Sequence, residues 1–244
     1  MSNENIKNLN IFVICNKQKE HNRFINCEKQ FDSIDIKKKI NIHYYKYIWY
    51  DEIDEEIYKK YCKTDKSMIR HGRSSSDKRL TYGELSLVLN MVNCLKKIRD
   101  EYNDGYFLIL ESDFLLEDDF KLKLDSLLDF LNTKNINFDI INIGEGLRKD
   151  MLKTYFIEND TYKFNNLKLK RSKRNSCAEG TLWNIKSINK FLNYFEKEND
   201  VNGPWDTMLD ELNNFIDKEW ILYLLFPSLL SQGSIKGLFT SYIH

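Results

Sequence analysis

The feature that most constrains the fold is a buried-strand pattern that ends in two carboxylates. Residues 106–110 form a continuous apolar run, and the turn-forming residues 103–105 precede it. Such a run is typical of a strand covered on both faces, as in the middle of an α/β sheet. Glu111 and Asp113 follow at its carboxyl end, where open α/β sheets hold their ligands.

These two acids are candidate metal ligands. Carboxylates at positions i and i+2 can approach one divalent cation, and oxygen ligands suit magnesium or manganese. The alternative is a solvated acidic strand end, because 30% of the residues are charged.

Composition limits the classes of protein to consider. A chain of 244 residues that is 42% hydrophobic can bury a core of one domain, which we expect to span residues 1–244. The 37 basic and 37 acidic residues cancel, so no net field attracts a polyanion and no nucleic-acid partner is expected. Five scattered cysteines without a CxxC pair predict reduced thiols.

The sequence also predicts a cytoplasmic protein. No apolar stretch is long enough to span a membrane, and the polar start MSNENIKNLN lacks a signal-peptide core. The richness in Asn, Lys and Ile is similar to that of proteins from AT-rich genomes, such as those of large DNA viruses. A viral origin would place the protein in the host cytoplasm or the virion.

Strand and helix patterns alternate along the chain. Strands are expected at residues 10–14, 40–49, 106–110, 138–143 and 180–185, and helices at 22–31, 81–98, 120–131, 187–195 and 205–215. The polar stretch 158–174 is expected to form an irregular excursion or a hairpin with a solvated basic face. Residues 63–79 lack periodicity and predict a mobile surface loop. The alternative is that its segment 70–79, with Arg79, closes over a diphosphate.

The start of the helix at residue 81 has two interpretations. Thr81 and Glu84 have the spacing of a capping box, and Gly83 permits a tight entry to the helix. A role of Gly83 and Glu84 in binding a ligand is the other interpretation.

Six short segments, in order along nearly the whole chain, resemble glycosyltransferase family 25, which includes lipooligosaccharide and collagen galactosyltransferases. They are the strand and Arg-ending loop 11–23, GELS at 83–86, LESD at 110–113, GTLWNI at 180–185, PWD at 204–206 and PSLLSQ at 227–232. The chain departs from the family at Ser112, which replaces an acid, and at Asn90 and Met91, which replace a Ser-His pair.

The resemblance implies a single α/β domain with a GT-A-type glycosyltransferase fold, built on a Rossmann-like, mostly parallel sheet with helices on both faces. It implies a metal-dependent hexosyltransferase that uses Mn²⁺ or Mg²⁺. The donor would be a UDP-sugar carrying galactose or glucose, and the acceptor a glycan or protein hydroxyl, with inversion at the sugar. Whether the chain forms a homo-oligomer stays open.

Roles for individual residues follow from the resemblance and from the chemistry of sugar transfer. Residues expected to bind the donor are Arg23, Arg79, Gly83, Glu84 and Glu111. Metal ligands are expected at Glu111 and Asp113, and candidates for a third ligand are Asp206, Gln232 and His244. Asp206 is also the expected catalytic base, because the attacking hydroxyl must lose its proton. Trp183 and Trp205 are expected in the core, with stacking on a sugar ring as the alternative.

Two other functions stay open. A nucleotidyltransferase would act on sugar phosphates with carboxylate-held magnesium. Such an enzyme is expected to have a glycine-rich phosphate loop near the first strand, but residues 14–24 contain no glycine. A binding module that has kept the fold and lost the chemistry is the second, with Ser112 as the supporting sign.

Overall fold

The computed structural model describes residues 9–36, 40–63, 80–145, 156–174, 179–198, 200–201, 203–214 and 220–240. The expected surface loop, including Arg79, lies outside this part of the chain apart from its first residue, Lys63. His244 also lies outside it.

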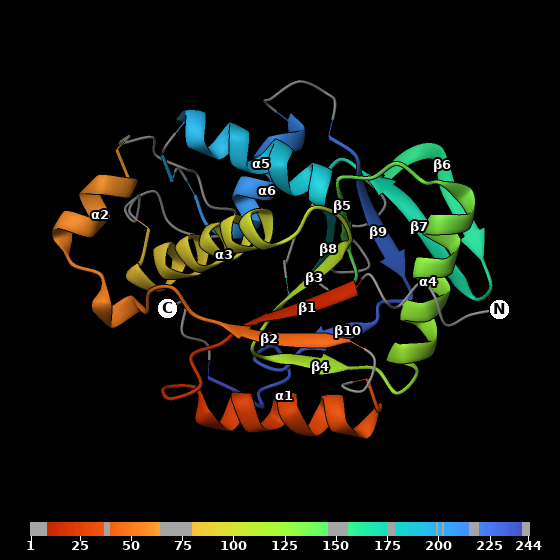
Figure 1. Cartoon of the computed structure of the whole chain (residues 1–244), viewed down its shortest axis with the longest axis horizontal. Helices are drawn as coiled ribbons and strands as arrows, with labels where there is room; N and C mark the ends of the chain where they lie inside the picture. Colours follow the sequence, from red (N-terminus) through yellow and green to blue (C-terminus); the bar gives the residue numbers. More distant parts are fainter. Residues whose placement is uncertain are drawn as a thin grey trace.

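The described chain alternates strands and helices (Figure 1). The strands are β1 (Leu9–Ile14), β2 (Asn41–Tyr45), β3 (Tyr106–Glu111), β4 (Phe114–Leu116), β5 (Ile140–Asn142), β6 (Phe156–Phe164), β7 (Leu167–Ser172), β8 (Gly180–Asn184), β9 (Leu222–Phe226) and β10 (Leu230–Gln232). The helices are α1 (His21–Ser33), α2 (Glu55–Tyr61), α3 (Tyr82–Glu101), α4 (Phe120–Lys134), α5 (Ile185–Glu198) and α6 (Trp205–Asn214), with a short 3-10 helix, η2 (Tyr50–Glu52).

The main sheet has eight strands in the order β2-β1-β3-β8-β5-β9-β7-β6. The strands β1, β2, β3, β5, β6 and β9 run in one direction, whereas β7 and β8 run against them. The predicted α/β class is therefore confirmed, and the sheet is mixed with most strands aligned. A second, two-stranded sheet pairs β4 with β10.

Helices cover both faces of the main sheet because its central strands are apolar on both sides. In β3, Phe107 and Ile109 pack into one core with α3, α5 and α6. Leu108 and Leu110 pack into the other core with α1 and α4. Successive strand side chains point to opposite faces, so one continuous apolar run fills two cores.

The sequence predicted most elements within a few residues of their observed bounds. The stretch 158–174 proved to be the β6–β7 hairpin at the edge of the sheet. Five elements were not predicted: η2, α2, β4, β9 and β10. The apolar run of β9 is continuous and buried over Leu222–Leu225, so the same signal that identified β3 was present there.

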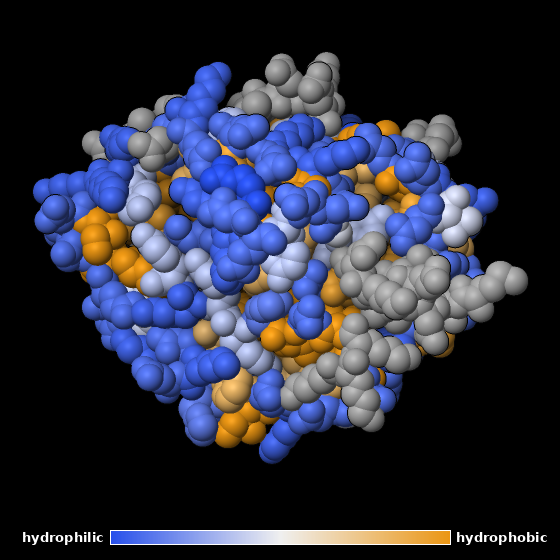
Figure 2. Space-filling view, in the orientation of Figure 1, coloured by the Kyte–Doolittle hydropathy of each residue, from blue (hydrophilic) through white to orange (hydrophobic). Residues whose placement is uncertain are grey.

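The surface is mainly polar. Hydrophilic residues predominate on the face shown in Figure 2, and hydrophobic residues show through in separate patches. Within the described ranges, no helix is long and apolar enough to cross a membrane.

Candidate functional site

The candidate site lies where the order of the strands reverses. From β1 the chain passes through α1 to β2 on one side, and later through α3 to β3 on the other side of β1. The carboxyl ends of β1 and β3 therefore open a crevice at a topological switch point, the usual ligand position in open α/β sheets. Glu111 ends β3, as the sequence predicted.

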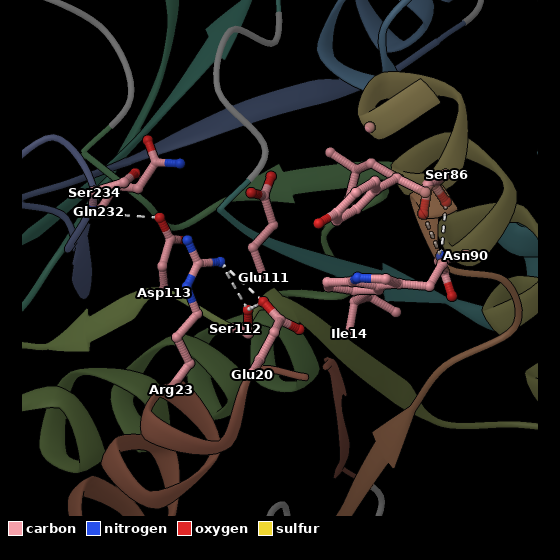
Figure 3. Close-up of a pocket in the computed structure, with 14 residues that line it drawn as sticks. Ile14, Glu20, Arg23, Ser86, Asn90, Glu111, Ser112, Asp113, Gln232 and Ser234 are labelled. Atoms are coloured by element: carbon pink, nitrogen blue, oxygen red, sulfur yellow. Dashed lines mark hydrogen bonds and ion pairs between the residues drawn. The ribbon is translucent and has the colours of Figure 1, made fainter. Parts of the chain in front are cut away.

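An open cavity occupies this crevice (Figure 3). At one end it is lined by charged and polar residues, which are Glu20, Arg23, Glu111, Ser112, Asp113, Gln232 and Ser234. At the other end it is lined by Ile14, Trp49, Tyr50, Gly83, Ser86, Leu87 and Asn90. The structure thus brings together Arg23, Gly83, Glu111, Asp113 and Gln232 from the predicted set.

Asp113 is buried beneath the charged end, with 3% of its surface exposed. Its main-chain oxygen accepts a 2.7 Å hydrogen bond from Gly233 N. Its Oδ2 accepts a longer one, 3.4 Å, from Ser234 N. Among the described residues and without any ligand, Asp113 Oδ1 has no hydrogen-bond partner. A buried carboxylate oxygen without a partner lowers the stability of the fold unless a ligand binds to it.

Glu111 lies close to three other acids. Its pKa is raised well above the ordinary value, first by burial and then by the charges of Asp113, Glu179 and Asp206, while Arg23 opposes the shift. Glutamate in such surroundings resists ionisation unless a positive charge is placed beside it. The charged end is therefore electrostatically suited to a cation.

Glu179 was not predicted as a site residue. Its main-chain oxygen accepts a 3.1 Å hydrogen bond from Glu111 N, and its side chain is buried. The carboxyl group packs against Gly144, where a Cβ would lie only 2.5 Å from Glu179 Oε1. The sequence signal was the acid directly before the predicted strand at 180, but only the antiparallel pairing of β3 with β8 brings it to Glu111.

Glu20, Arg23 and Ser112 form a hydrogen-bonded group beside the two predicted metal ligands (Figure 3). Arg23 Nη1 donates to Glu20 Oε1 at 3.0 Å and to Ser112 Oγ at 3.1 Å. Ser112 Oγ donates to Glu20 Oε1 at 2.6 Å. Glu20 was not predicted as a site residue, because its contact with Ser112 after β3 joins parts of the chain that lie far apart in sequence.

The opposite end of the cavity is held by side-chain bonds between α3 and the chain after β2. Asn90 Nδ2 donates to Ile48 O at 2.5 Å, and Asn90 Oδ1 accepts from Tyr47 N at 2.6 Å. Ser86 Oγ also donates to Ile48 O, at 2.9 Å. These bonds place the rings of Trp49 and Tyr50 at the cavity wall. Neither ring was predicted as part of the site.

The structure favours capping for Glu84. Thr81 Oγ1 accepts from Glu84 N at 3.2 Å, and Glu84 Oε2 accepts from Thr81 N at 2.9 Å. This is the predicted capping box. Glu84 is buried and does not line the cavity, whereas Gly83 does.

The two tryptophans considered for sugar stacking are core residues. Trp183 and Trp205 are 0% and 1% exposed, and their ring centroids lie 6.4 Å apart. The core interpretation is confirmed for both.

The late candidates for metal or base roles differ in position. Gln232 lines the cavity. Asp206 does not line it, although its charge raises the pKa of Glu111. Asp206 Oδ1 accepts a 2.9 Å hydrogen bond from Thr207 N in the first turn of α6. His244 and Arg79 lie outside the described residues.

The donor set fits a cation that is shared with a substrate. Across the described ranges, no three His, Cys, Asp or Glu side chains converge as a complete metal site. Magnesium, however, is usually held by one or two carboxylates together with waters and substrate phosphates. Glu111 and Asp113 supply two carboxylates, and Asp113 Oδ1 is available for such a bond.

Comparison with known proteins adds no family assignment. No protein-family model matches this chain, and no curated protein matches it. The resemblance to glycosyltransferase family 25 therefore rests on the short motifs alone.

Proposed function

We propose that the protein is a metal-dependent glycosyltransferase of the GT-A type that transfers a hexose from a UDP-sugar to a hydroxyl of a glycan or protein. The observation that carries the proposal is the charged cavity at the switch point between β1 and β3. There Glu111, with its raised pKa, lies beside the buried Asp113, whose Oδ1 lacks a partner in the described structure.

Charge separation explains why such a cavity suits sugar transfer. Breaking the bond between sugar and phosphate leaves a nucleoside diphosphate with growing negative charge. A divalent cation stabilises that charge without a proton. Glu111 and Asp113 would hold Mn²⁺ or Mg²⁺, and Arg23 lies on the same wall.

The shape of the cavity supports a nucleotide as the ligand. Its charged end suits a diphosphate with its cation. Trp49 and Tyr50 at the other end offer aromatic surface, and an aromatic face stacks on any nucleobase. The two ends belong to one cavity, as expected for a ligand with a charged and an aromatic part.

The proton of the acceptor hydroxyl needs a base. Asp206 remains our candidate. It lies near enough to Glu111 to raise the pKa of that residue. A base separate from the metal ligands is required, because carboxylates that hold a cation have lost much of their basicity.

A thermal-stability screen of nucleotide sugars, with and without manganese, tests the proposal. A ligand that binds only the folded state raises Tm by mass action. At a ligand concentration one hundred times its Kd, the free energy of unfolding rises by about 2.7 kcal/mol. We expect UDP-galactose or UDP-glucose to raise Tm only when manganese is present. We also expect the protein to release UDP when it is incubated with that nucleotide sugar and manganese.

The matched variants are Asp113→Asn and Asp118→Asn. Asp113→Asn removes the buried charge with little change of shape, and we expect UDP release to fall at least about 100-fold. Asp118 lies after β4 and does not line the cavity, so Asp118→Asn should keep its activity. Metal-dependent binding without turnover of any nucleotide sugar would instead support the binding module.

A further inference from the structure

The Glu20–Arg23–Ser112 group has a hydrogen-bond pattern that the hydroxyl at position 112 completes and that an ionised carboxylate there would not complete. Ser112 Oγ donates to Glu20 Oε1 and accepts from Arg23 Nη1. A hydroxyl offers one donor and two acceptor lone pairs, whereas an ionised carboxylate only accepts. Ser112 is 3% exposed, so water does not readily replace either bond.

Glu20 is fixed in place independently of Arg23. Glu20 Oε2 accepts a 2.9 Å hydrogen bond from Asn16 N. Asn16 Oδ1 in turn accepts from Gln18 N and Lys19 N, at 3.2 Å each. The loop between β1 and α1 is therefore folded around a carboxylate that is 3% exposed. A buried charge of this kind needs its donors.

Arg23 is held from two sides. One side is Glu20 and Ser112. On the other, Arg23 Nη2 donates to Thr240 O, and the guanidinium lies 5.7 Å from the ring centroid of Phe239. The planar group therefore has one orientation, at the wall of the cavity (Figure 3). A guanidinium in a fixed orientation can bind phosphate oxygens in a bidentate manner.

We propose that Glu20 and Ser112 are a positioning pair that orients Arg23 toward the phosphate groups of the ligand. The ligand's identity rests on the proposed function, whereas the pair itself does not. The pair also limits the charge of the site, because a second carboxylate at position 112 would face Glu20 Oε1 at hydrogen-bond distance.

The variant Glu20→Gln separates positioning from simple charge. It removes a negative charge from the wall of an anion site, so electrostatics alone predict tighter phosphate binding. If Glu20 positions Arg23, binding should weaken instead. We expect the Kd of pyrophosphate with manganese, measured by calorimetry, to rise at least about 10-fold, which corresponds to about 1.4 kcal/mol. Equal or tighter binding by the folded variant would overturn the positioning role.

A double variant tests whether the two residues act as a unit. Ser112→Asp should lower Tm by about 5 °C or more, because two buried carboxylates then repel. Adding Glu20→Gln should recover at least half of that loss and also restore pyrophosphate binding, because one carboxylate remains and the amide supplies a donor to it. Additive effects of the two substitutions would overturn the pair.

Two controls complete the experiment. Asp51→Asn breaks the exposed ion pair between Asp51 and Lys19, which lies in the loop between β1 and α1. It should change neither Tm nor Kd, since exposed ion pairs contribute little to stability. Ser112→Ala keeps the contact between Glu20 and Arg23 and should weaken binding less than Glu20→Gln. If wild-type protein does not bind pyrophosphate with manganese, the proposed function and the phosphate ligand are both rejected. The Tm of the double variant then still shows whether Glu20 and Ser112 act as a unit.

Discussion

At the scale of single residues, the raised pKa of Glu111 makes stability depend on pH. Its cause is burial among the charges of Asp113, Glu179 and Asp206. The folded state then holds a proton that the unfolded state, with an ordinary glutamate pKa of about 4.3, has released. Stability should therefore fall as pH rises from that value through the raised folded pKa.

The variant Glu111→Gln tests this linkage. In buffer free of divalent cations, the Tm of Glu111→Gln should equal or fall below that of wild type near pH 4. Above the raised pKa of Glu111 in the folded state, the Tm of the variant should exceed that of wild type. Manganese favours the charged carboxylate, so it should raise the Tm of wild type more at pH 8 than at pH 5.5 and should raise that of Glu111→Gln less. Parallel Tm curves for the two proteins between pH 4 and pH 8 would contradict the assignment.

The catalytic base is a second question at this scale. A positioned general base contributes about 100- to 10,000-fold. We expect Asp206→Asn to lower kcat for transfer by that factor while the Kd of the donor with manganese stays within about threefold. Asp210→Asn on the same helix is the control. Loss of kcat in Glu179→Gln with normal kcat in Asp206→Asn would transfer the role to Glu179.

Some of the site residues were predictable because their chemistry is local. Glu111 and Asp113 follow an apolar run, and strand ends in α/β sheets are ligand positions. Glu20 and Glu179 were missed because their roles depend on contacts between distant parts of the chain. Glu20 contacts Ser112, which is 92 residues away in sequence.

At the scale of elements, the capping box of α3 is coupled to the cavity through Gly83. Thr81→Ala removes the acceptor for Glu84 N and should lower the free energy of unfolding by about 1 kcal/mol. Gly83 lies in the first turn of α3, which loses its cap in this variant, and it lines the cavity. The affinity for the donor should therefore fall as well. Chemical denaturation and calorimetry measure the two effects.

Helix α2 supplies the control for this prediction. Asp54 Oδ1 accepts from Ile57 N at 2.8 Å and caps α2, and neither residue lines the cavity. Asp54→Ala should therefore cost a similar stability without changing affinity. Equal affinity in both variants would show that the cap of α3 does not shape the site.

Element positions followed from local pattern, but strand direction did not. Residues 180–185 were predicted as a strand, and β8 lies there. Its antiparallel pairing with both β3 and β5 depends on how the chain returns to the sheet, which apolar periodicity does not record. The short strands β4 and β10 were missed for a related reason: each has three residues, fewer than a period-2 pattern needs to stand out.

At the scale of the whole molecule, the cavity joins the first and last described parts of the chain. Residues 233–240 follow β10 and contact both Asp113 and Arg23. A chain that ends at Gln232 loses these contacts but keeps every strand of the main sheet. We expect its far-UV circular dichroism to stay close to that of wild type, and its affinity for UDP with manganese to fall at least about 10-fold.

A chain that ends at Thr240 is the matched comparison. It retains the bond between Arg23 and Thr240 and removes His244. Wild-type affinity for manganese in this shorter chain would exclude His244 as a metal ligand, whereas a clear loss would support that prediction.

The contact between Arg23 and Thr240 also has a consequence for biosynthesis. A ribosome makes Thr240 217 residues after Arg23. A nascent chain can pair β1 with β2 and β3 long before the wall of the cavity is complete. Full affinity for phosphate would therefore arise only after Thr240 has left the ribosome, and products that stop before Thr240 would bind phosphate more weakly.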